Sequence, residues 1–131
     1  MALLNQDFIK FDYDTFQIRF TITDATTSLS GYTGWWGVSE TPTGSTVVEK
    51  VSSGWTTGPS PGSNAQLEMG VSTATVKLSQ ADFGVGNLQP NTVYYHELVL
   101  SPDGTEDNSV VVASGDFTVN PSLFTESGYR P

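Results

Sequence analysis

The sequence contains no cysteine, so neither disulfides nor thiolate-bound metals can stabilise its fold. It contains a single histidine, His96, and no G-x-S-x-G motif, which leaves almost no material for a nucleophilic triad. No apolar run approaches membrane-spanning length, and the first residues lack the basic and apolar regions of a secretory signal. We therefore expect a protein that is made in the cytoplasm and folds by burial alone.

Basic residues are also scarce. Five Lys and Arg face fourteen Asp and Glu, which gives a formal net charge of -9. Such a chain repels polyanions and anionic bilayers, so nucleic acid and membranes are not expected partners.

Turn-forming residues are abundant, with 13 glycines and 7 prolines in 131 residues. Alternating apolar residues at 16–23 predict a strand with one buried face, and further strands are expected at 33–40, 45–51, 91–100 and 109–119. Residues 67–78 return to the same pattern, with Gly70 as a bulge or break. About seven strands with regular turn signals favour an all-β sandwich over a barrel.

The most specific local signal is NLQPNTVYY at 87–95. Leu88, Pro90, Thr92 and Tyr94 have the L-x-P-x-T-x-Y spacing that precedes the penultimate strand of fibronectin type III-like sandwiches. This resemblance implies a tyrosine corner, in which the Tyr94 ring packs in the core and its hydroxyl bonds to backbone near Leu88 or Gln89. We expect one immunoglobulin-like or fibronectin type III-like sandwich at 1–120, including an N-terminal arm, and a C-terminal arm at 121–131.

A wider resemblance covers residues 7–121. The order F-x-I-x-F-x-I-T-D, LSGYTGWW, VKLSQADFGVGNLQPNTVYYHELVLSPDG and ASGDFTV is similar to small immunoglobulin-like domains of tailed-phage virion proteins, in particular the N-terminal domain of baseplate upper proteins. The resemblance implies a virion structural protein. Because the chain holds one domain, we expect a free-standing capsid decoration or cement protein rather than a tail or baseplate protein, the main alternative.

Candidate chemical sites are few. His96 shares strand parity with Tyr94 and is most simply a histidine bonded within the sandwich, since a metal site needs several convergent ligands. Asp12 and Asp14 share a parity and could form a glycosidase pair, but solvated or turn-capping roles are simpler. The 103–108 loop offers oxygen donors without calcium-loop spacing. We expect no enzyme, cofactor or metal.

The two adjacent tryptophans must point to opposite faces of their strand. Trp36 is two residues from the apolar Val38, so both should face the core and Trp35 should lie on the outer face. Small neighbours there would leave its indole projecting from the sheet. Trp35 is then either an anchor for another subunit or covered by the 52–65 loop or a terminal arm. The residues expected to contact partners are Trp35, Trp55, Leu123, Phe124 and Tyr129.

The expected partners are the major capsid protein or other virion subunits, and a homo-oligomer is a further alternative. A carbohydrate-binding module, with Trp35 and Trp55 stacking on sugars, is the remaining alternative. Such modules usually accompany a catalytic domain and a secretion signal, so the structural role is favoured.

Overall fold

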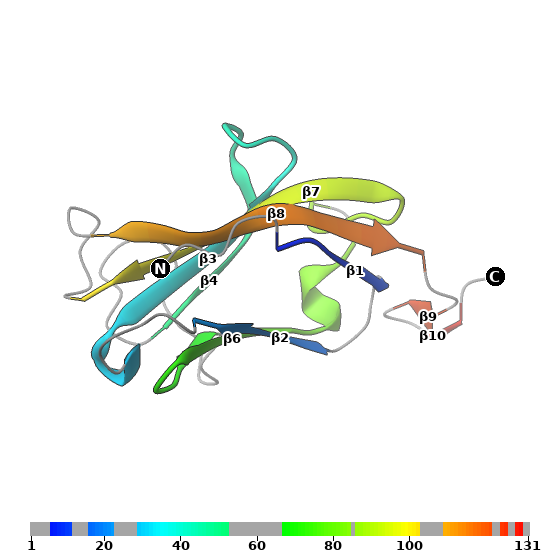
Figure 1. Ribbon diagram of the computed structural model, residues 1–131. Coiled ribbons are helices and arrows are strands. Elements are labelled where there is room, and N and C mark those ends of the chain that lie inside the picture. The colour runs from blue at the N-terminus through cyan, green and yellow to red at the C-terminus, as the bar shows by residue number, and fades with distance from the viewer. Residues whose placement is uncertain are drawn as a thin grey trace.

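Two β-sheets face each other across a shared hydrophobic core (Figure 1). The computed structural model describes residues 6–11, 16–22, 29–52, 67–84, 86–102, 109–121, 124–125 and 128–129. Every regular element in these ranges is a strand or a three-residue 3-10 turn, so the predicted all-β sandwich is confirmed.

The larger sheet has five strands in the order β1-β8-β7-β3-β4. β1 pairs with β8 in parallel, and the other pairs are antiparallel. The strands are β1 (Phe8–Phe11), β8 (Val110–Asn120), β7 (Thr92–Ser101), β3 (Thr33–Ser39) and β4 (Thr46–Val51).

The smaller sheet has three antiparallel strands in the order β2-β6-β5: β2 (Phe16–Thr21), β6 (Thr73–Leu78) and β5 (Leu67–Met69). The break expected at Gly70 is present, and it separates two strands. The chain reverses after Gly70, whose amide donates to the Thr73 carbonyl at 2.8 Å. Leu67 and Val76 are cross-strand partners on the buried face, so the inward positions change from odd-numbered residues in β5 to even-numbered residues in β6 across this turn.

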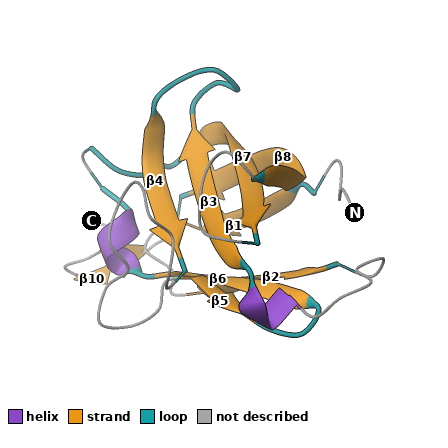
Figure 2. Ribbon diagram, turned by 90° about the vertical axis from the view of Figure 1, so that its left-hand side faces the viewer, coloured by secondary structure: helices purple, strands orange, loops and turns teal. Residues whose placement is uncertain are grey.

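This topology is immunoglobulin-like. In immunoglobulin nomenclature, strands β2 to β8 correspond in order to B, C, C′, D, E, F and G. The three-stranded sheet is then B-E-D, the larger sheet contains G-F-C-C′, and β1 pairs with G. Figure 2 shows the three-stranded sheet passing beneath the larger one. The side of the five-stranded sheet that faces away from the three-stranded sheet is called the outer face below.

The core forms where the alternating apolar residues of both sheets meet. Ile18, Phe20 and Ile22 point inward from β2 and its end, as the pattern over 16–23 predicts. The largest fully buried side chains include Trp36, Tyr94 and Phe117.

A hydrogen-bonded aromatic cluster occupies the place of the disulfide of antibody domains. In antibody domains, a tryptophan of strand C packs against a disulfide that links strands B and F. The cysteine on strand F comes two residues after the corner tyrosine. In this chain that position is His96, which is fully buried. Its Nδ1 accepts a hydrogen bond from Trp36 Nε1 at 3.2 Å, and the ring of Phe20, from the opposite sheet, lies 5.9 Å away between centroids.

The tyrosine corner has a defined geometry. The Tyr94 hydroxyl accepts a hydrogen bond from the Gln89 amide at 2.7 Å, which is the contact that the spacing predicts. Leu88 is fully buried, and Asn91 takes a φ of 59°, a left-handed conformation that asparagine tolerates.

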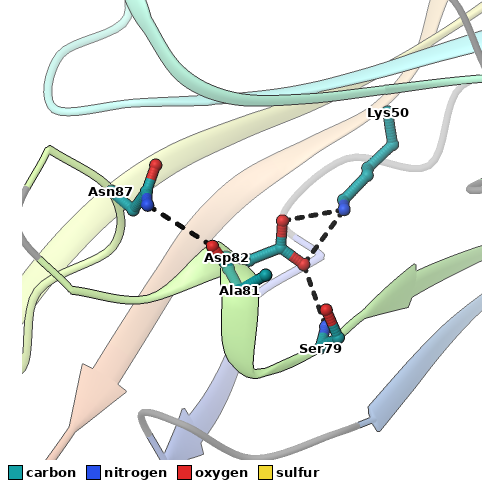
Figure 3. Close-up of polar contacts among 5 residues, drawn as sticks. All are labelled: Lys50, Ser79, Ala81, Asp82 and Asn87. Atoms are coloured by element: carbon teal, nitrogen blue, oxygen red, sulfur yellow. Dashed lines mark hydrogen bonds and ion pairs between the residues drawn. The ribbon is translucent and has the colours of Figure 1, made fainter. Parts of the chain in front are cut away.

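An ion pair joins β4 to the connection that follows β6 (Figure 3). Lys50 Nζ lies 2.8 Å and 3.0 Å from the two Asp82 carboxylate oxygens. Asp82 ends the 3-10 turn η2 (Gln80–Asp82), and its Oδ2 also accepts from the Ser79 amide at 2.9 Å, as in a capping box. Lys50 lies in β4 of the five-stranded sheet, and Asp82 follows β6 of the three-stranded sheet. The ion pair therefore connects the two sheets.

Short elements complete the described chain. The 3-10 turn η1 (Leu29–Gly31) buries Leu29. Near the C-terminus, β9 (Phe124–Thr125) and β10 (Gly128–Tyr129) pair only with each other in the described residues.

Candidate interaction surface

The outer face brings an aromatic and acidic group of side chains together around Gly37. In the register, Gly37 lies opposite Glu49 of β4 on one side and Glu97 of β7 on the other. Trp35 and Tyr95 are two residues away along β3 and β7, so they share this face. Four aromatic or acidic side chains therefore lie around one glycine.

Trp35 does not stand proud of the sheet as expected. Its indole lies across Gly37, where a β-carbon would overlap the ring, and Trp35 is half-buried. The indole Nε1 donates to Glu49 Oε2 at 3.0 Å, while Glu49 Oε1 accepts from Thr46 Oγ1 at 2.6 Å. These contacts fix the ring flat, with one of its faces against the sheet.

Tyr95 provides the second aromatic group. Its hydroxyl donates to Glu97 Oε2 at 2.8 Å. Burial and the hydrogen bond to Glu97 raise the pKa of Tyr95 above its usual value of 10.0, so the phenol stays neutral and remains a donor at physiological pH.

A small pocket opens between these groups, which we call the outer pocket. Its volume is about 100 Å³, and its lining includes Trp35, Gly37, Pro42, Tyr95 and Glu97. Pro42 belongs to the turn between β3 and β4, which projects away from the three-stranded sheet (Figure 2). The turn forms one end of the pocket.

An apolar row lies beside the pocket on the same face. Ile9 and Val93 both lie opposite Thr118, one from each side of β8. They are 62% and 56% exposed. Val93 precedes Tyr95 by two residues on β7, so the row and the outer pocket form one continuous surface.

Only part of the predicted contact set can be located. Trp35 lies on the outer face, whereas Trp55 and Leu123 fall outside the described residues. The backbones of Phe124 and Tyr129 pair with each other, and the structure does not describe their side chains. Asp12, Asp14 and the 103–108 loop also lie outside the described residues.

Sequence reasoning missed Glu49, Tyr95, Glu97, Ile9 and Val93. Each occupies a position that alternates with buried residues on its strand, so the sequence could have indicated that it faces outward. Their grouping depends on the cross-strand register, which parity alone does not give.

His96 lies in the core and not on this surface. Its Nε2 lies 2.6 Å from the Gln6 carbonyl, and because Nδ1 accepts from Trp36, Nε2 carries the proton and donates to that carbonyl. Burial lowers the pKa of His96, although the Gln6 bond and the charges of Asp7, Asp116 and Glu97 oppose this effect.

In the described ranges, no three His, Cys, Asp or Glu side chains are grouped closely enough to hold a metal ion. No helix in that part of the chain is long and apolar enough to cross a bilayer. No protein-family model matches the sequence, and no curated protein is detectably similar to it.

Proposed function

We propose that this chain is a bacteriophage virion structural protein, a capsid decoration protein that binds neighbouring subunits through its outer face. The observation that carries the proposal is the exposed apolar row of Ile9 and Val93 beside a half-buried Trp35. The sequence resemblance to immunoglobulin-like domains of phage virions supplies the biological setting.

The row is informative because the two apolar side chains flank Thr118 on one face of the sheet, one from each strand beside β8. Antiparallel sheets that face water on one side usually carry polar residues on that face. Fully burying an aliphatic side chain of this size contributes about 1.5 to 3 kcal/mol. A partner that covers Ile9 and Val93 would gain such a contribution, and the neighbouring pocket would add polar contacts that fix its orientation.

A tail or baseplate location remains the alternative, and it would use the same surface with a different subunit. The flat indole of Trp35, with a carboxylate at its edge, keeps a carbohydrate-binding module as a second candidate, since sugars also stack on such rings. The pocket of about 100 Å³ favours the protein partner, because it would hold a side chain but little of an oligosaccharide.

The test uses the full chain and particles of the phage that encodes it. Ile9→Ser and Val93→Ser remove the row, and Val71→Ser is the matched control, because Val71 is 71% exposed in the turn between β5 and β6. We expect the double row variant to lose co-sedimentation with particles lacking the native chain, while Val71→Ser co-sediments like the native chain.

Equal melting temperatures of the three proteins would show that folding is unaffected. Undiminished co-sedimentation of the row variant, or no co-sedimentation of the native chain, would refute the proposal.

A further inference from the structure

We propose that the outer pocket binds the guanidinium group of an arginine presented by the partner subunit. This inference rests on the proposed function, since it names the chemistry that the partner offers to the outer face. It is carried by the size of the pocket, the charge of the face and the orientation of Trp35.

The size limits the ligand to one side-chain end. Pockets for drug-sized molecules and cofactors have volumes of about 300 to 1,000 Å³. The outer pocket, at about 100 Å³, lies well below that range. It therefore fits a single planar group that enters from a neighbouring surface.

The charge of the outer face selects a cation. Glu49, Glu97 and Asp116 all lie on this face, since Asp116 is the cross-strand partner of Tyr95. The described basic residues do not lie on this face. Arg19 and Lys77 belong to the three-stranded sheet, and Lys50 points inward to Asp82. Lys10 is on the inward side of β1, opposite the buried Val119. The ion pairs formed in the described part of the chain do not use these three carboxylates.

Glu49 and Glu97 keep free acceptor positions. A carboxylate offers about four lone-pair sites. The described side-chain bonds occupy two sites on Glu49, from Trp35 and Thr46, and one on Glu97, from Tyr95. These donors hold the two carboxylates in place, and Glu97 presents oriented oxygens to a cation that enters the pocket.

Trp35 provides a flat surface for a planar cation. One face of its indole lies against Gly37, so its exposed surface is largely the opposite face, above the pocket floor. Tryptophan is the best aromatic partner for a cation, and arginine stacks on such rings while its N–H groups bind carboxylates in the same plane. A lysine ammonium would gain the charge attraction without this stacking and paired hydrogen bonding, so arginine fits better.

The experiment titrates the full-length ¹⁵N-labelled chain with N-acetyl-arginine amide at constant ionic strength and follows the Trp35 indole N–H by NMR. N-acetyl-citrulline amide is the matched probe, because it has a similar shape without the charge. Glucose tests the carbohydrate alternative. Trp35→Phe assigns the signal.

We expect a saturable shift with the arginine probe and not with citrulline or glucose. Glu97→Gln should weaken the arginine probe roughly tenfold, because Glu97 lines the pocket and the substitution removes one charge-assisted contact. Glu68→Gln, on the three-stranded sheet, is the matched control and should bind like the native chain.

No saturable shift, an equal response to citrulline, binding of glucose instead, or equal weakening by Glu68→Gln would each overturn the inference. These results are separate from the proposed function, because co-sedimentation that depends on Ile9 and Val93 would stand even if arginine does not bind.

Discussion

Trp35 and Trp36 are neighbours in β3 with different roles in the fold. Trp36 is fully buried and donates to His96, whereas Trp35 lies over Gly37 on the outer face. Trp36→Ala should lower the free energy of unfolding by about 3 to 5 kcal/mol, because it opens a cavity and removes the donor to His96. Trp35→Ala should cost about 1 kcal/mol, chiefly through the lost bond to Glu49.

Chemical denaturation of the two isolated variants measures this difference. Equal losses of unfolding free energy would mean that the indole of Trp35 is as important to folding as that of Trp36, and its assignment to a partner surface would fail.

His96 should titrate below its usual pKa of 6.5, because burial disfavours the imidazolium more than Asp7, Asp116 and Glu97 favour it. Protonation would also remove the Nδ1 acceptor used by Trp36. In the unfolded chain the histidine keeps its ordinary pKa, so its contribution to stability is complete above about pH 6.5 and declines as the pH falls toward the folded pKa.

Since the chain has one histidine, its ring signals in an NMR pH titration are unambiguous. A midpoint at or above 6.5 would contradict the buried, neutral state.

At the scale of elements, the Lys50–Asp82 pair connects β4 to η2. The two side chains are only 8% and 14% exposed, so removing one partner leaves a poorly solvated charge. Lys50→Met should therefore destabilise the chain by about 3 kcal/mol, and Asp82→Asn should largely relieve that loss when the two are combined. Urea unfolding of the four proteins in this cycle gives the coupling, and strictly additive losses would show that the pair does not act as a unit.

The strands differ in how well the sequence predicts them. The alternation of Ile18, Phe20 and Ile22 is sufficient for β2, because one face is buried and the other wet. Between β5 and β6 the inward positions change from Leu67 to Ala74 and Val76, and this change of parity marks the break at Gly70. Periodicity locates this break, but only the antiparallel register shows that the chain reverses there rather than forming a bulge.

The candidate surface was partly predictable for the same reason. Parity placed Trp35 outside and Trp36 inside, as the structure has them. The flat position of the indole depends on Gly37, and the two flanking carboxylates depend on the register of three strands. Such pairings between distant segments cannot be read from one strand at a time.

At the scale of the whole molecule, an immunoglobulin-like sandwich without cysteine is held by a hydrogen-bonded aromatic cluster and an ion pair between its layers. Neither of these contacts uses the outer face of the larger sheet. That face combines the apolar row, the outer pocket and three carboxylates, a composition suited to a basic, partly apolar partner surface.

Hydroxyl-radical footprinting of the chain, free and mixed with phage particles, tests the proposal that the outer face contacts a virion subunit. The method reads side-chain exposure directly. Binding should protect Ile9, Val93 and Trp35 together and leave Val71 unchanged, because Val71 lies in the turn between β5 and β6, outside the five-stranded sheet. Protection of Val71 with unchanged labelling of Ile9, Val93 and Trp35 would contradict the account.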